Sequence, residues 1–158
     1  MRISRIVVLQ AIVVMMVLLG GSPGYAQSGH VMLTMDDVKW TEGPAALPKG
    51  AQLFMMEGNP PDAAPFTMRL KFPANYKVGP HWHSAIEHAT VLKGTLNLGM
   101  GEKFDASQTK ALPVGSFVVI PPKTAHFAWT SEETIVQLHG VGPWSVNYVN
   151  QADDPRRK

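Results

Sequence analysis

The stretch GPHWHSAIEH, residues 79–88, holds three of the six histidines of this 158-residue chain and one glutamate. The side chains of His81 and His83 point the same way only on a β-strand, because residues two apart on a helix point almost oppositely. On one straight strand Glu87 would lie ~13 Å from His83, which metal bonds of ~2 Å could not bridge. A metal site that includes Glu87 therefore requires a turn over residues 84–86 that brings it back on a second strand.

The sequence on both sides of this stretch predicts further short strands. Apolar or alternating runs are separated by Gly, Pro, Asn and Asp, and no segment sustains a helical period. These runs cover residues 51–57, 66–72, 89–94, 95–101, 115–122, 126–130, 134–140 and 144–149. Many short strands in one chain predict an all-β fold, either an antiparallel sandwich or a barrel.

A third histidine follows the turn signal Pro-Pro-Lys-Thr at residues 121–124. Proline is disfavoured in the interior of a sheet because it has no backbone N–H to donate, so this segment separates two strands. His126 begins the second of them, and alternation places His126 with Ala128 on one face and Phe127 on the other. Such a hairpin can bring His126 inward, beside the pair formed by His81 and His83.

The spacing of these residues resembles the two motifs of the cupin superfamily. The first motif has the form G-x5-H-x-H-x3-E-x6-G. His81, His83, Glu87 and Gly94 match it in register, and Asn75 stands in place of its opening glycine. The second motif has the form G-x5-P-x-G-x2-H-x3-N. Gly115, Pro121 and His126 match it, while Lys123 replaces its inner glycine and Thr130 its final asparagine.

The resemblance implies an antiparallel jelly-roll barrel with one metal ion inside its mouth. The implied ligands are His81, His83, Glu87 and His126. Three imidazoles and one carboxylate leave coordination positions open for a substrate or dioxygen, and they suit a divalent Mn, Fe, Ni, Cu or Zn ion. The departures from the motifs leave these four residues untouched. Lys123 affects the backbone conformation of a turn, because glycine at such a position usually allows a conformation that other residues avoid. Thr130 affects one interaction of the second hairpin.

Two further residues are candidates for catalysis. Gln137 and His139 share one face of the strand predicted over residues 134–140. If that face lines the barrel interior, the two side chains could orient a ligand or transfer protons near neutral pH. The alternative is a hydrogen-bonded histidine at the edge of a sheet.

The predicted function is that of an exported metal-binding cupin. The open coordination positions favour a metal-dependent enzyme of the dioxygenase, lyase or isomerase type that acts on a small oxygen-bearing organic molecule. A fold does not determine a reaction, however. A non-catalytic protein that binds a small molecule or the metal itself is the alternative.

The N-terminal residues predict export. Arg2 and Arg5 precede an apolar run over residues 6–19, and small residues follow it, an arrangement typical of a secretory signal peptide cleaved after Ala26. The alternative is an uncleaved membrane anchor. The predicted organisation is a signal peptide (1–26), an N-terminal arm (27–45), the cupin barrel (46–150) and a polar C-terminal tail (151–158). The mature protein would be periplasmic or secreted.

Composition narrows the partners. Without the two arginines of the signal, basic and acidic residues balance, and no basic cluster is present, which argues against nucleic acid or a membrane surface as a partner of the mature chain. Cysteine is absent, so thiolate ligands and disulfides are excluded. The expected partner is a small molecule. An outward-facing aromatic patch would favour a homodimer, and its candidate members are Trp82, Trp129, Trp144 and Phe127.

Overall fold

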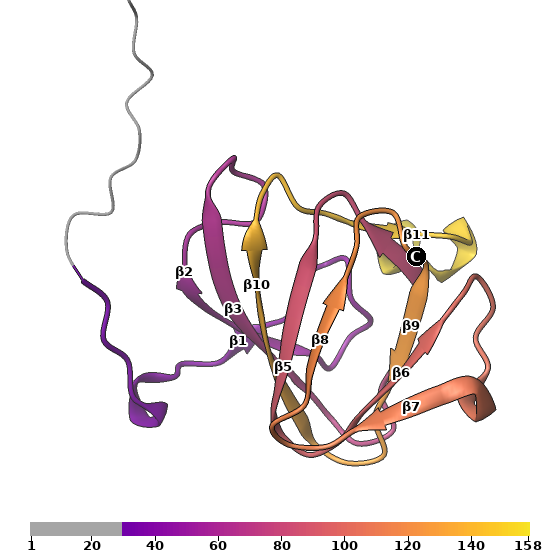
Figure 1. Cartoon of the computed structure of the whole chain (residues 1–158), viewed down its shortest axis with the longest axis horizontal. Coiled ribbons are helices and arrows are strands. Elements are labelled where there is room, and N and C mark those ends of the chain that lie inside the picture. Colours follow the sequence, from indigo (N-terminus) through magenta and orange to yellow (C-terminus); the bar gives the residue numbers. More distant parts are fainter. Residues whose placement is uncertain (1–29) are drawn as a thin grey trace, which may run out of the picture. The chain divides into compact units, whose positions relative to one another are not determined.

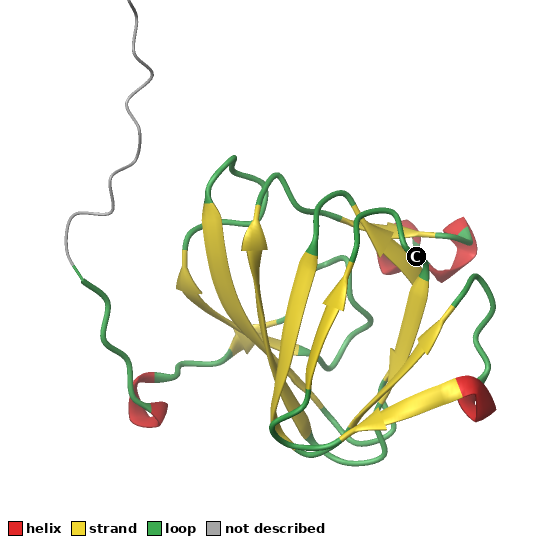
Figure 2. Cartoon of the chain, viewed as in Figure 1, coloured by secondary structure: helices red, strands yellow, loops and turns green. Residues whose placement is uncertain are grey.

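The computed structural model describes residues 30–158, and the predicted signal peptide lies outside them. Strands dominate this part of the chain, and the helices are short 3-10 turns (Figure 1, Figure 2). These turns are η1 (Met35–Asp37), η2 (Ala106–Gln108), η3 (Gln151–Asp153) and η4 (Pro155–Arg157). No helix within residues 30–158 is long and apolar enough to cross a membrane.

Two antiparallel sheets form the domain. Sheet A has the order β1-β2-β3-β10-β5-β8, with β1 (Thr41–Glu42), β2 (Gln52–Glu57), β3 (Pro65–Phe72), β10 (Thr134–Val141), β5 (Glu87–Lys93) and β8 (Phe117–Ile120). Sheet B has the order β11-β4-β9-β6-β7, with β11 (Val146–Tyr148), β4 (Lys77–His83), β9 (His126–Trp129), β6 (Leu96–Met100) and β7 (Thr109–Leu112). Strands far apart in the sequence lie side by side, as in a jelly roll (Figure 1). The predicted all-β jelly-roll fold is confirmed.

The core lies on the inner faces of the two sheets. Strand β3 shows the pattern most clearly, because its side chains alternate between buried and half-buried. The buried set is Phe66, Met68, Leu70 and Phe72. Burying apolar side chains of this size contributes ~1.5–3 kcal/mol each, so alternation along the strands fixes which face turns inward.

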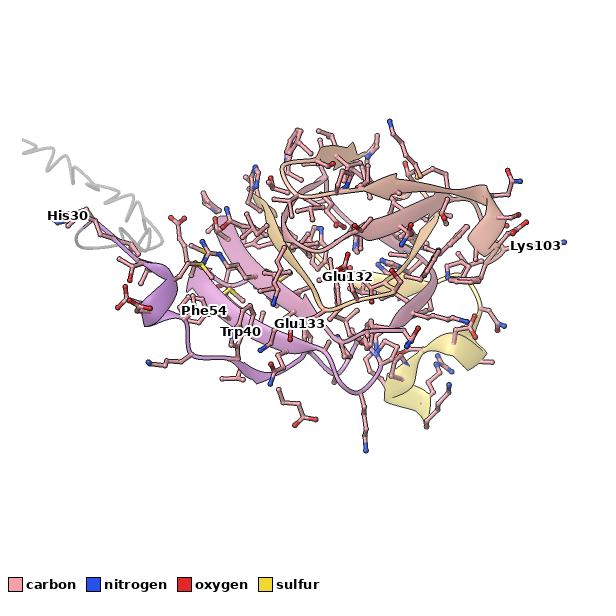
Figure 3. All side chains as sticks on the ribbon, turned by 90° about the horizontal axis from the view of Figure 1, so that it is seen from below. His30, Trp40, Phe54, Lys103, Glu132 and Glu133 are labelled. Atoms are coloured by element: carbon pink, nitrogen blue, oxygen red, sulfur yellow. The ribbon has the colours of Figure 1, made fainter. Side chains whose placement is uncertain are left out.

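The connection between β6 and β8 contains a strand that the sequence pattern does not predict. Strand β7 pairs with β6, and η2 precedes it. Before η2, the ring of Phe104 packs on Phe127 of β9 at 5.1 Å between centroids, so Phe127 is only 1% exposed. Lys103 points outward from this connection (Figure 3). The segment that precedes η2 therefore covers part of the outer face of sheet B.

Two departures from the cupin motifs fall at backbone positions that favour glycine. Asn75 has φ of 59° and Lys123 has φ of 60°, both in the left-handed region. Asparagine tolerates this region better than most residues, whereas lysine is strained there. The backbone N–H of Lys123 also donates to the carbonyl of His83 at 2.8 Å. The unusual turn therefore ties the second motif to the end of β4.

The third departure, Thr130, is buried and makes two hydrogen bonds to the segment before β4. Thr130 is 1% exposed, and its hydroxyl donates to the carbonyl of Pro73 at 2.8 Å. Its backbone N–H donates to the carbonyl of Tyr76 at 3.0 Å. Threonine therefore anchors the end of the second motif to the segment that contains Asn75.

Replacing Lys123 with glycine should stabilise the protein. Glycine adopts a positive φ without the steric cost that a Cβ atom brings, so we expect the free energy of unfolding to rise by ~1 kcal/mol. Urea unfolding measures this change. Lys110→Gly, in strand β7, is the matched control and should instead destabilise by ~0.5–1 kcal/mol. Equal destabilisation by both substitutions would contradict this account of the turn.

The C-terminal tail packs on the domain. Asp154 is 8% exposed and accepts hydrogen bonds from the backbone N–H and the guanidinium of Arg156. The same guanidinium donates to the carbonyl of Val146 at 3.1 Å. The tail thereby places the paired charge of Arg156 beside β11.

Candidate metal centre

Strand β4 carries His81 and His83, and a β-bulge directs them inward. The register between β4 and β9 shifts between Val78 and His81. Because of this shift, Val78 and both histidines face the interior, although His81 lies three positions after Val78 and regular alternation would place the two on opposite faces. The strand that the first motif requires is therefore present.

Strand β9 supplies the third imidazole. His126 is the register partner of His81, and the centroids of their rings are 4.2 Å apart. His126 and Ala128 face inward while Phe127 faces outward, as the alternation predicts. One nitrogen from each of His81, His83 and His126 lies within 4.8 Å of the others. The three histidines could therefore hold one metal ion.

Backbone carbonyls fix the orientation of all three rings. The Nδ1 atoms of His81, His83 and His126 lie 2.8, 3.0 and 3.0 Å from the carbonyl oxygens of Gly79, Ser145 and Thr124. A carbonyl oxygen only accepts, so each Nδ1 must carry the proton. In the neutral ring this leaves the lone pair on Nε2. Metal-bound histidines typically show this arrangement.

Glu87 reaches the same site from the other sheet. Strand β4 ends at His83 in sheet B and β5 begins at Glu87 in sheet A, so the predicted turn between them is confirmed. Oε2 of Glu87 lies 2.5 Å from Nε2 of His83 and 4.0 Å from Nε2 of His126. Despite this proximity, neither Oε2 of Glu87 nor Nε2 of His83 has a hydrogen-bond partner. Buried polar atoms that face one another without a hydrogen bond fit a cation that both would bind.

The electrostatics of the site favour ligands in the state that binds metal. Burial, together with His126 and His83, lowers the pKa of His81 to about 3. Burial also lowers the pKa of His126, although Glu87 opposes this shift. Burial would raise the pKa of Glu87, but the adjacent histidines outweigh it and hold that pKa below its ordinary value. At neutral pH, His81 and His126 are therefore neutral while Glu87 is a carboxylate.

The four side chains line a largely apolar cavity of about 390 Å³. Both sheets contribute aliphatic walls: sheet A supplies Leu53, Met55, Met68, Leu70, Val118, Val136 and Leu138, and sheet B supplies Val78, Leu96, Leu98 and Val146. Polar lining residues outside the four candidate ligands are Asn59, Ser145 and Arg156, the last already paired with Asp154. The cavity is large enough for a small organic molecule. Its composition favours a ligand with an apolar body and a polar end at the histidines.

The prediction that Gln137 and His139 line the barrel interior, on which their catalytic roles depend, is wrong. Val136 and Leu138 are the residues of β10 that line the cavity, so Gln137 and His139 lie on the opposite face of sheet A. There Gln137 accepts a hydrogen bond from Arg69 at 3.1 Å, and the ring of His139 stacks on that of His88 at 4.7 Å. Because the cavity is apolar, the apolar side chains of β10 face it and the polar ones face outward.

The predicted outward aromatic patch is also wrong for two of its four members. Phe127 is covered by Phe104, and Trp144 is 8% exposed and lines the cavity. Sequence reasoning missed Trp144 as a residue of the site, since it lies in the loop between β10 and β11, where no periodic pattern operates. Exposed apolar side chains occur instead on the edge strand β8, at Phe117 and Val119. A homodimer remains a prediction.

Comparisons with known proteins agree with this architecture. The model of the ChrR cupin-like domain family matches residues 28–145. The polyketide cyclase RemF from Streptomyces resistomycificus superposes with a TM-score of 0.65 at 19% identity, over 82% of this chain and 92% of that one. An acetylacetone dioxygenase from Acinetobacter johnsonii gives a TM-score of 0.62 at 13% identity, over 85% and 86%.

A third solved structure is an RmlC-like cupin from Shewanella frigidimarina. It gives a TM-score of 0.55 at 14% identity, over 79% of this chain and 96% of that one. At such identities the likeness shows the fold alone. No curated protein sequence is significantly similar to the chain. The family match extends over most of the chain and includes both histidine motifs, so the protein belongs to the ChrR cupin-like domain family of the cupin superfamily.

Proposed function

We propose that this protein is a metal-dependent enzyme of the dioxygenase type that acts on a small, mainly apolar molecule with a chelating pair of oxygens. One observation carries the proposal: three imidazoles present free Nε2 lone pairs beside a buried carboxylate, in the wall of an otherwise apolar cavity. His81, His83, Glu87 and His126 would hold one divalent Mn, Fe, Ni, Cu or Zn ion. Such an ion supplies Lewis acidity and, if redox-active, a means of activating dioxygen.

The charge of the site narrows the class of substrate. A divalent ion held by three neutral imidazoles and one carboxylate carries a net charge of about +1. An isolated charge in an apolar cavity is costly, so a monoanionic chelating group would be favoured. Enolates of diketones and monocarboxylates with a neighbouring oxygen fit this requirement. The aliphatic walls from both sheets would then bind the remainder of the molecule and exclude water.

The comparisons support this class without specifying a substrate. Among structures of the same fold is an acetylacetone dioxygenase, whose named substrate is a small diketone. In a dioxygenase reaction both oxygen atoms enter the products, and the substrate itself supplies the four electrons that reduce O2. The proposed reaction therefore needs no external reductant. Export through the predicted signal peptide is part of the proposal, and the ion would then be acquired outside the cytoplasm.

Oxygen uptake tests the proposal. The metal-loaded protein is offered a panel of small diketones and of hydroxy and keto monocarboxylates, with product analysis by mass spectrometry. We expect one O2 consumed per substrate, both atoms of labelled O2 in the products, and no uptake by the His81→Ala/His126→Ala variant. Binding without any product would favour the non-catalytic alternative. Uptake that persists in the double variant would place the activity elsewhere.

A further inference from the structure

Trp144 packs face to face on one of the candidate metal ligands. Its ring centroid lies 4.1 Å from that of His83, with 19° between the two planes. On a different neighbour, Phe66, the indole packs at 5.6 Å with the planes tilted by 52°. Because Trp144 is only 8% exposed, the indole is a fixed part of the wall behind His83.

The loop that carries Trp144 also supplies the hydrogen-bond acceptor for His83. The carbonyl of Ser145, the next residue, accepts from Nδ1 of His83 at 3.0 Å. One short segment therefore restrains the imidazole in two ways. The hydrogen bond fixes the position of one ring atom, and the stack fixes the plane of the ring.

Backbone contacts hold this loop in place from the opposite side. The N–H of Trp144 donates to the carbonyl of Pro60 at 2.7 Å, and the N–H of Gly142 donates to the carbonyl of Ala64 at 3.0 Å. A Cβ atom on Gly142 would lie 2.2 Å from the carbonyl oxygen of Asp62, so only glycine allows this approach. The loop between β2 and β3 thereby sets the position of the indole.

His83 has a particular need for such a restraint. Its Nε2 lies 2.5 Å from Oε2 of Glu87, much closer than the 4.0 Å between Glu87 and His126. An imidazole free to turn would face the carboxylate alone rather than a point shared with His81 and His126. We propose that Trp144 is a positioning residue, which holds the plane of the His83 ring so that its Nε2 faces the common metal. This proposal rests on the function proposed above.

Metal affinity tests this role without any need for turnover. Co²⁺ binding is measured by titration, and the visible spectrum of bound Co²⁺ reports the ligand geometry. Trp144→Leu removes the flat ring, so we expect at least ~10-fold weaker binding and a changed spectrum, as for other residues that orient metal ligands. Trp144→Phe keeps a stacking ring and should stay within ~3-fold of the wild type with an unchanged spectrum.

Two additional variants make the result specific. Trp82→Leu is the matched control, because Trp82 lies between the two ligand histidines on β4 but points away from the cavity; its Co²⁺ affinity should not change. Trp144→Met, whose flexible unbranched side chain adapts better to the space left by the indole, replaces the leucine variant if that variant does not fold.

The outcomes separate this role from the proposed function. Wild-type affinity and spectrum in Trp144→Leu or Trp144→Met would overturn the positioning role, as would an equal loss in Trp144→Phe. A wild-type protein that binds no metal would refute the proposed function itself.

Discussion

The variant His81→Ala/His126→Ala should contain no bound metal, whereas the wild-type protein should contain close to one ion per chain. The substitution removes two of the three imidazoles whose nitrogens lie within 4.8 Å of one another. The expected loss of affinity is far larger than the ~10–100-fold typical of residues that only orient a ligand. Elemental analysis of the purified proteins measures the metal content, and circular dichroism checks that the variant keeps its sheets.

The barrel offers a matched control that also replaces two histidines. His88 and His139 are paired across β5 and β10 and stack on the outer face of sheet A. His88→Ala/His139→Ala should therefore retain the metal of the wild type, together with any activity. If both double variants lost metal equally, the assignment of the inner site would fail. Metal retained in the inner variant would contradict it as well.

Lowering the pH should destabilise the metal-free protein over a range in which most surface groups do not change charge. Below pH 6.5 the unfolded chain protonates His81, whereas the folded protein resists this until about pH 3. Stability then falls by up to ~1.4 kcal/mol per pH unit for each such proton. His126 acts in the same direction. The lowered pKa of Glu87 adds a further loss once the pH falls below 4.5.

Urea unfolding in the presence of a chelator, between about pH 7.5 and pH 5, measures this dependence. His81→Asn removes one of the groups and should flatten the slope by about one proton. Bound metal should shift the loss of stability to lower pH, because protons must then displace the ion. The electrostatic account of the site would be contradicted if the free energy of unfolding of the metal-free wild type did not change over this pH range. It would also be contradicted if the wild type and His81→Asn showed the same dependence on pH.

The sequence predicted the fold and the residues that meet because the signals for them are local. The spacing between His81 and His83 requires a strand, and the four residues from His83 to Glu87 require a turn if both face one ion. Alternation after the Pro-Pro turn correctly placed His126 inward. Each of these inferences depends on geometry within about ten residues.

On β10 the alternation of apolar residues and the chemistry of the polar residues predict opposite inner faces. Val136 and Leu138 show the alternation of a buried face, whereas Gln137 and His139 are candidates only because their polar groups suit catalysis. The cavity is apolar apart from a few positions, so the ordinary rule applied. The sequence offered no means of learning that the cavity would be apolar before the fold was known.

Other features depend on contacts between segments distant in the sequence. Trp144 reaches His83 because residues 58–64 hold its loop, and Phe127 is buried because Phe104 folds over it. The backbone conformation at a motif's glycine position, in contrast, follows from the motif even where another residue stands there. Lys123 has the left-handed conformation that its motif position implies, although its own side chain disfavours it.

Anomalous diffraction at the absorption edge of the bound metal tests the central claim most directly. The account predicts one strong peak within ~2.0–2.3 Å of Nε2 of His81, His83 and His126. Oε2 of Glu87 should lie at a similar distance from the same peak. A crystal of metal-loaded protein with no peak among these atoms, or with its peak on the outer face beside His88 and His139, would contradict it.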